Sequence, residues 1–374
     1  MARTTFNTLF LNSIDPGVWG GLEHWMELTG VGLARRGHSV TFAGRENSVF
    51  LRRVSAHEET TTLPLAISGD FHPTAIRQLA DASATNSVDI VLCNFVKDVR
   101  LAELARKFHQ LHFRIVWTPG VNLAKKTLSH KFLFSGFVDR AIVPSLSLRD
   151  DIIKSGFLDP ARFEVIPIGI DETVWQGNRQ DGRQFLGQRY DLPDNAFICL
   201  TSGRFVRQKG HRYLIEAARM LAERFPNIFY VLLGDGPLQT DLMEQIKRYQ
   251  LTDRFIFCGL LEDHHRAVFA ADLYVHPSII EPYGIVLVEA MAAGLPVVAT
   301  RTGGIPEVVA ENETALLVEP ADPAGLTEAI ERMYTDHSLP LAFGRAGRDR
   351  FLKYFRLETM IERLEICLQK VMAG

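Results

Sequence analysis

The stretch from Glu281 to Thr300 constrains the fold more than any other part of the chain. It begins with the turn-prone Glu-Pro-Tyr-Gly, continues as an apolar helical run that contains Glu289, and ends in a short apolar strand pattern. Residues four and eight apart lie on nearly the same face of a helix, so a loop and the helix after it can hold both carboxylates. The first free N–H groups of that helix lie between them. A sugar nucleotide requires such backbone donors and a carboxylate for its ribose diol, although the spacing alone also fits two solvated glutamates on an amphipathic helix.

The length and charge of the chain indicate the number of domains and argue against one class of function. A chain of 374 residues is long for one domain and sufficient for two. Its composition, 47% hydrophobic and 23% charged, supplies enough apolar side chains for two cores. The net charge of −3 and the isoelectric point of about 6.5 argue against a nucleic-acid-binding protein, which would carry a basic surface.

The cysteines and the hydropathy pattern bear on the cellular compartment. Four cysteines are widely spaced without a C-x-x-C pair, which favours buried free thiols in a reducing cytosol: Cys93, Cys199, Cys258 and Cys367. The N-terminus leads directly into a strand pattern, so no signal peptide is expected. No apolar run is long enough to cross a bilayer. We therefore expect a cytoplasmic protein and leave peripheral membrane contact open.

The first half alternates strand and helix patterns, which predicts a parallel sheet covered on both faces. Gly20 and Gly21 precede the first helix, where paired glycines let backbone N–H groups approach an anionic phosphate. A simple tight turn is the alternative. Ligands bind at the carboxyl ends of parallel strands. Asn94 and Thr118 stand at two such ends, so we consider both as candidate acceptor-binding residues.

The second half repeats the alternation and adds positive charge at one strand end. After the strand pattern 197–201, Gly203 loosens the turn, and Arg204 and Lys209 precede the next helix. Two cations near a helix start suit a diphosphate, although an isolated loop of this kind is common. Gly234 ends the following strand pattern. His276, in front of the central stretch, is interpreted as a structural histidine.

These motifs together resemble the GT4 family of retaining glycosyltransferases, two-domain GT-B enzymes that use nucleotide sugars. The resemblance rests on the central stretch and on four shorter motifs that follow the family order: G-G-x-E at 20–23, I-P-x-G-x-D at 166–171, G-R-x-x-x-x-K-G at 203–210 and G-x-G-P at 234–237. It implies an α/β fold of two Rossmann-like parallel-sheet domains facing a central cleft. The implied domains are 1–167 on the acceptor side and 168–355 for the nucleotide sugar, with a C-terminal helix at 356–374 crossing back to the first.

The resemblance also implies a role for each site residue. Arg204 and Lys209 would neutralise the leaving diphosphate, which borders Gly20, Gly21, Gly203 and Gly234. Glu281 would lie by the sugar ring with the amides of Tyr283, Gly284 and Ile285, and Glu289 would accept from the ribose hydroxyls. No metal and no cofactor are expected, since the chain has no D-x-D and the cations supply the charge.

The acceptor side departs from the family pattern. Thr118-Pro119-Gly120 stands where many members carry a histidine, so no acceptor histidine is assigned. The stretch 121–137 interleaves lysines with large apolar residues, which fits either a helix at the edge of the core or a cationic surface for an anionic membrane. We expect a UDP-linked hexose-type sugar as donor, and a saccharide or lipid-linked saccharide as acceptor, in cell-surface glycan synthesis. A GT-B epimerase, a phosphorylase or a non-catalytic nucleotide-sugar-binding protein remains the alternative.

Overall fold

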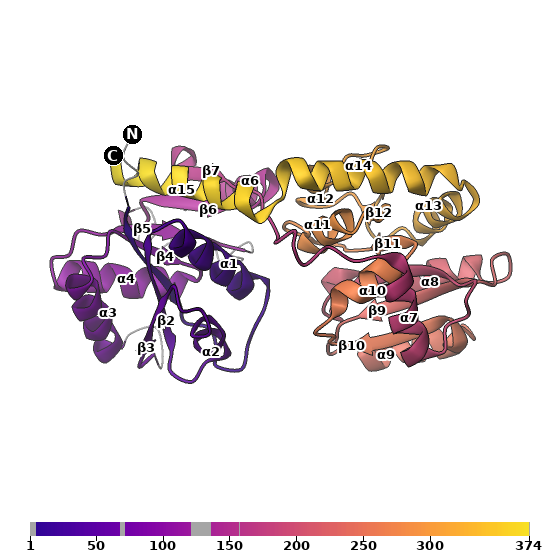
Figure 1. The fold of residues 1–374 in the computed structure, drawn as a ribbon, viewed down its shortest axis with the longest axis horizontal. Helices are drawn as coiled ribbons and strands as arrows, with labels where there is room; N and C mark the ends of the chain where they lie inside the picture. The colour runs from indigo at the N-terminus through magenta and orange to yellow at the C-terminus, as the bar shows by residue number, and fades with distance from the viewer. Residues whose placement is uncertain (1–4, 68–71, 121–135, 157, 374) are drawn as a thin grey trace. The chain divides into compact units, whose positions relative to one another are not determined.

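The computed structural model divides into two compact units (Figure 1). It describes residues 5–67, 72–120, 136–156 and 158–373. The first unit extends to Ile168 and includes the C-terminal segment from Leu357, and the second comprises Gly169–Arg356. Each unit contains one parallel sheet with helices packed against it, as the alternating sequence pattern predicts.

The sheet of the first unit has seven strands in the order β3-β2-β1-β4-β5-β6-β7, and every pair is parallel. Its strands are β1 Asn7–Asn12, β2 Ser39–Arg45, β3 Thr61–Leu65, β4 Ile90–Cys93, β5 Arg114–Trp117, β6 Arg140–Val143 and β7 Phe163–Val165. Its helices are α1 Gly21–Arg35, α2 Val49–Val54, α3 Pro73–Thr85, α4 Val96–Phe108, α6 Leu146–Ser155 and α15 Leu357–Ala373, with a 3-10 turn η1 at Pro160–Arg162.

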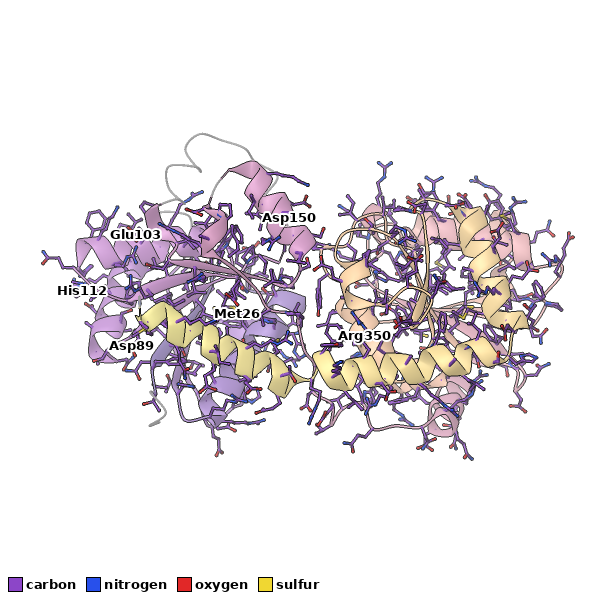
Figure 2. All side chains as sticks on the ribbon, turned by 90° about the horizontal axis from the view of Figure 1, so that it is seen from above. Met26, Asp89, Glu103, His112, Asp150 and Arg350 are labelled. Carbon is purple, nitrogen blue, oxygen red and sulfur yellow. The ribbon has the colours of Figure 1, made fainter. Side chains whose placement is uncertain are left out.

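Both faces of this sheet are covered because successive side chains of a strand point to opposite sides. Leu9 and Leu11 of β1 pack into a core shared with α3, α4 and α6. Phe10, between them, packs into a second core with α1, α2 and α15. Met26 of α1, labelled in Figure 2, is fully buried in this second core.

Buried charges attach α15 to the first unit. The Glu365 carboxylate lies 2.5 Å from the Arg36 guanidinium and 3.2 Å from the His38 imidazole. Glu365 and His38 are nearly inaccessible to solvent, and a buried carboxylate such as that of Glu365 is stable only when it is paired. Because α15 supplies Met360, Ile361 and other side chains to the core, the C-terminal helix is an integral part of this unit.

The sheet of the second unit has six parallel strands in the order β10-β9-β8-β11-β12-β13. Its strands are β8 Phe197–Ser202, β9 Ile228–Leu233, β10 Phe255–Gly259, β11 Leu273–His276, β12 Val297–Thr300 and β13 Ala315–Val318. Its helices are α7 Arg179–Tyr190, α8 His211–Leu221, α9 Gln239–Arg248, α10 His264–Ala270, α11 Ile285–Ala292, α12 Ile305–Val308, α13 Pro323–Thr335 and α14 Ser338–Tyr354, with 3-10 turns η2 Arg207–Lys209 and η3 Thr252–Arg254.

Helices α8, α9, α13 and α14 supply the core on one face of this second sheet. Arg350 of α14, labelled in Figure 2, donates to the backbone carbonyls of Val308 and Glu307 at 2.7 and 2.9 Å. These bonds satisfy carbonyls at the end of α12, which have no partner within so short a helix. The long α14 therefore holds the segment that follows β12 in place.

Each sheet has one point where the strand order reverses. In the first unit this point lies between β1 and β4, and in the second it lies between β8 and β11. Ligands of open parallel sheets bind outside the carboxyl ends of the strands at such a point. The glycine pair follows β1, the cationic loop follows β8 and the Glu281 loop follows β11, so the strand order places these motifs at the two switch points.

Candidate functional site

Two loops meet at the switch point of the second sheet. The loop after β8 contains Gly203 and Lys209, and the loop after β11 contains Glu281. The carbonyl of Gln208 accepts from the backbone N–H groups of Ile279 and Ile280 at 2.7 and 3.3 Å. These hydrogen bonds join the loops although they are about 70 residues apart in the chain.

Glycines make the close approach of these loops possible. A Cβ at Gly210, whose φ is +67°, would lie 1.9 Å from the carbonyl oxygen of Pro277. A Cβ at Gly234, whose φ is +131°, would lie 2.2 Å from the carbonyl oxygen of Gly203. Both contacts are between backbones, which cannot give way as a flexible side chain can. The glycines of the two motifs after β8 and β9 are therefore required by packing at this edge.

Glu281 is the centre of a buried polar cluster. Its Oε2 atom lies 2.5 Å from Lys209 Nζ, 2.8 Å from His276 Nε2 and 3.3 Å from Ser278 Oγ. Ser278 Oγ is also 3.0 Å from the same His276 nitrogen. Glu281 is 6% exposed and His276 is 1% exposed, whereas the Lys209 side chain is 26% exposed. Lys209 is thus the most exposed member of the cluster.

The cluster keeps the Glu281 carboxylate ionised. Burial by itself would raise the pKa of Glu281, but the hydrogen bond and charge of His276 and the charge of Lys209 outweigh it. The result is a pKa of about 2, below the usual value of 4.5. Glu281 therefore carries its negative charge throughout the neutral range and acts as a hydrogen-bond acceptor only.

The first turn of α11 lies directly after this carboxylate. Gly284 precedes the helix with φ of +97°, and the helix begins at Ile285. Gly304 N–H donates to the carbonyl of Glu281 at 3.0 Å, and a Cβ at Gly303 would lie 1.9 Å from that oxygen. The glycine pair after β12 therefore closes over the backbone of Glu281 and fixes the loop that leads into α11.

Glu289 lies in the second turn of α11, where the eight-residue spacing places it. Its side chain is 19% exposed, and its Oε1 is 3.8 Å from Nε2 of His264, the first residue of α10. Both helices begin at the carboxyl edge of the sheet, after β11 and β10. Glu289 is therefore accessible at the same edge as Lys209 and Glu281.

Arg204 lies in the loop after β8 and is exposed. Within the part of the chain that the structure describes, its guanidinium makes no ion pair with a carboxylate. It differs in this from Lys209, whose charge is already paired with Glu281. Arg204 thus presents positive charge to solvent near the start of α8.

The switch point of the first sheet carries the remaining predicted residues. Gly20 precedes α1 in extended conformation, and Gly21 is the first helical residue. Asn94 and Thr118 follow adjacent strands, and the Thr118 hydroxyl donates to the Asn94 amide oxygen at 2.7 Å. Both are 4% exposed. The structure brings Asn94 and Thr118 together, while their role in acceptor binding stays a prediction.

Some features of the site were not expected from the sequence. His276 is buried, as a structural histidine would be, but it contacts Glu281 directly, and Ser278 completes that contact. In the sequence, only the short separation of His276 and Ser278 from Glu281 indicated that these residues contact it. All four cysteines are buried and unpaired, as predicted. Most of the stretch 121–137 lies outside the described residues.

The described residues contain neither a metal-binding cluster nor a membrane-spanning helix. No group of three or more His, Cys, Asp or Glu side chains is arranged to hold a metal ion there. No helix in the same part of the chain is both long and apolar enough to cross a bilayer.

Comparisons with known proteins agree with the geometry. The family model for group 1 glycosyl transferases matches residues 183–350, and the model for glycosyltransferase family 4 matches residues 19–174. An alpha-maltose-1-phosphate synthase of Mycolicibacterium smegmatis is 35% identical over 254 residues, which are 63% of this chain and 64% of that protein. The lipopolysaccharide core biosynthesis glycosyltransferase LpsE of Rhizobium meliloti is 32% identical over 174 residues, 46% of this chain and 50% of that protein. The chain thus matches between half and two thirds of the length of these relatives.

Solved structures resemble the whole chain. A glycosyltransferase from Rickettsia africae superposes with a TM-score of 0.86 at 19% identity, covering 99% of both chains. Anabaena Alr3699/HepE, solved in complex with UDP and glucose, superposes with a TM-score of 0.84 at 23% identity, covering 97% of this chain and 99% of the other. At these identities the likeness shows the fold, and the two family models, one on each unit, supply the family. The chain belongs to the group 1 glycosyltransferases of family 4 and has the GT-B fold.

Proposed function

We propose that the protein is a retaining glycosyltransferase that moves a hexose-type sugar from a UDP-sugar to a saccharide or lipid-linked saccharide. The observation that carries this proposal is the contact between Lys209 and Glu281 at the switch point of the second sheet, with Glu289 on the helix that follows. One accessible cation, one permanently ionised carboxylate and one rim carboxylate match the diphosphate, sugar and ribose of such a donor.

Each step of the transfer has a residue suited to it. As the bond between the sugar and the diphosphate breaks, its electron pair passes to the phosphate oxygen, and Arg204 and Lys209 would stabilise the added negative charge. The acceptor hydroxyl attacks the same face of the sugar, and its proton passes to the departing phosphate oxygen. Glu281 would accept hydrogen bonds from the sugar hydroxyls beside the amides of Tyr283, Gly284 and Ile285.

Lys209 would change partners during this cycle. In the unliganded protein its ammonium group neutralises Glu281, and a bound diphosphate would compete for the same three donor hydrogens. Glu281 would keep His276 and Ser278 as partners when Lys209 turns to the phosphate. The buried histidine therefore allows the cation to be shared without leaving a buried carboxylate unpaired, which would be costly.

The relatives support the choice of substrates. The solved structures of Anabaena HepE contain UDP, UDP and glucose, or UDP-glucose. Curated relatives include a lipopolysaccharide core glycosyltransferase and the putative glycosyltransferase EpsD of Bacillus subtilis. Because lipopolysaccharide is a cell-surface glycan, we propose cell-surface glycan synthesis as the setting, and a cytoplasmic protein with peripheral membrane contact as the location.

An assay of the purified protein with UDP-, GDP- and ADP-sugars tests the proposal. We expect transfer from a UDP-sugar to a saccharide acceptor, with the anomeric configuration of the donor kept in the product by NMR. We expect the rate to persist in excess EDTA, because Arg204 and Lys209 supply the positive charge. Conversion of the donor without an acceptor would indicate an epimerase, and sugar phosphate formed from orthophosphate would indicate a phosphorylase.

Binding without any turnover would indicate a nucleotide-sugar-binding protein. The Glu281→Gln variant is the matched control for transferase activity. It keeps the shape of the side chain but removes the charge, so its turnover should be lower than that of the wild type. Loss of activity in EDTA that manganese restores would contradict the metal-independent mechanism.

A further inference from the structure

The imidazole of His264 faces Glu289 at the carboxyl edge of the second sheet. His264 begins α10 directly beyond β10, and Glu289 lies in the second turn of α11. The distance from His264 Nε2 to Glu289 Oε1 is 3.8 Å. The side chains are 40% and 19% exposed. The pair therefore lies at the rim of the site, where a ligand can reach the carboxylate without displacing the histidine.

A buried tryptophan restricts the position of His264. Trp175 is 5% exposed, and its ring meets the His264 imidazole edge-on with the centroids 5.9 Å apart. Trp175 also contacts the ring of Phe269, which belongs to the same helix as His264, at 6.2 Å. The aromatic contacts hold one side of the imidazole, which leaves its Nε2 directed to Glu289.

Of two adjacent histidines, the one that faces Glu289 is favoured to carry a proton. The Glu289 side chain raises the pKa of His264 above its usual value despite partial burial, with further help from the Glu262 carbonyl and from Asp263. Burial and the neighbouring charge of His264 lower the pKa of His265. The groups around His264 are thus Glu289 from α11, Asp263 before α10, His265 within it, and the uncharged Trp175.

We propose that His264 is a positioning residue for the nucleotide ribose, acting through Glu289. The inference rests on the proposed function, which assigns Glu289 to the ribose diol. A nucleoside that covers Glu289 removes water from a charged carboxylate, which then needs another partner. Protonated His264 is that partner on one side, and the remaining lone pairs of the carboxylate are left for the two ribose hydroxyls.

The pairing makes donor affinity depend on pH. His264 is protonated below its raised pKa, so the stabilisation of Glu289 is present at low pH and is lost as pH rises through that value. UDP-glucose is a suitable probe because its diphosphate is a diester that does not titrate near neutrality. We expect its Kd to increase about fivefold between about pH 6 and pH 9, the scale of a partly exposed ion pair.

Calorimetric titration of UDP-glucose into three histidine variants tests this inference. His264→Gln should bind about fivefold more weakly than wild type at the acid end and show no pH dependence. His264→Lys should keep tight binding to about pH 9, because a lysine stays protonated there. His265→Gln, the matched control one residue along the helix, should retain the wild-type profile. Thermal unfolding of each variant checks that the fold is intact.

Failure of the role proposed for His264 can be distinguished from failure of the ribose role proposed for Glu289. If His264→Gln keeps the wild-type pH profile while Glu289→Gln binds weakly, the positioning role is wrong and the ribose role of Glu289 stands. If Glu289→Gln binds UDP-glucose as tightly as wild type, the ribose assignment is wrong and the role of His264 falls with it. Wild-type protein that does not bind UDP-glucose would overturn both.

Discussion

At the scale of the residue, Lys209 has two properties: it pairs with a buried carboxylate, and it is itself partly exposed. It neutralises a buried carboxylate in the unliganded protein and remains partly exposed to solvent. A buried carboxylate that loses its cation is destabilised unless other donors remain, and here His276 and Ser278 remain. The Lys209 side chain can therefore be removed by mutation without leaving Glu281 entirely unpaired.

We expect Lys209→Ala to lower kcat by roughly 10²–10³, the effect of losing one preorganised electrostatic contact. The charge it supplies is needed most when the diphosphate departs, so the loss should exceed any change in donor KM. Steady-state kinetics with a saturating acceptor measures both. Arg207→Ala, which removes an exposed cation from the same loop, is the control and should remain close to wild type. Turnover of Lys209→Ala within threefold of wild type would refute the assignment.

The two glutamates should differ in their kinetic effects. Glu289 is assigned to the ribose, which ground state and transition state bind alike, so Glu289→Gln should chiefly raise donor KM. Glu281 is assigned to the reacting sugar and is ionised at neutral pH, so Glu281→Gln should chiefly lower kcat. Kinetics with varied donor concentration distinguish these effects, and indistinguishable profiles would contradict the separate roles.

At the scale of the element, the loop after β12 restricts the backbone position of the Glu281 loop, which leads into α11. Gly303 has φ of +53° and faces the Glu281 carbonyl at a distance that excludes a Cβ. Gly294, at the end of α11, has φ of +72°, but a Cβ there would meet no atom closer than 3.8 Å. A side chain at either position would adopt an unfavourable left-handed backbone conformation. Only a side chain at Gly303 would also clash with another part of the backbone.

We expect Gly303→Ala to destabilise the protein more than Gly294→Ala. Each substitution places a side chain in the left-handed region, which costs roughly 1–2 kcal/mol. Gly303→Ala adds overpacking of about 1–3 kcal/mol and should displace Glu281. A further kcal/mol lowers the Tm of a domain of this size by about 2–4 °C, measurable by calorimetry. An equal Tm in the two variants, with equal activity, would show that the loop can shift without affecting the site.

At the scale of the whole molecule, the stretch 121–137 is the part of the chain for which we propose contact with a membrane. The stretch 121–137 carries Lys125, Lys126 and Lys131 among apolar residues, and most of it lies outside the described structure. Each basic residue close to an anionic membrane contributes about 1 kcal/mol. We therefore propose that these three lysines support weak, salt-sensitive attachment despite the net charge of −3.

We expect wild-type protein to co-sediment with vesicles that contain phosphatidylglycerol at low salt, and to be released as salt rises. A variant with Lys125→Glu, Lys126→Glu and Lys131→Glu should not sediment. Neutral phosphatidylcholine vesicles serve as the control, since charge drives the binding. Equal sedimentation of both proteins, or none by wild type at low salt, would favour an acceptor that is not membrane-bound.

The sequence by itself determined the elements and the chemistry available to them. Alternating strand and helix patterns predicted two parallel sheets, because the period of side-chain burial is a local property of each segment. The Glu281 loop, the helix with Glu289 and the cationic loop after β8 were all predicted at strand ends. Their glycines were recognised as turn residues, since a positive φ restricts the residue type locally.

Only the tertiary structure decided which of these residues touch. Lys209 reaches Glu281 across 72 positions because β11 inserts next to β8, a choice of strand order that local patterns do not encode. The same order brings His276 into contact with the Glu281 carboxylate. Helix α10, which connects β10 to β11, brings His264 to Glu289. Contacts between loops depend on how whole sheets assemble, so the partners of Glu281 and Glu289, and with them the charge state of the site, emerged only from the fold.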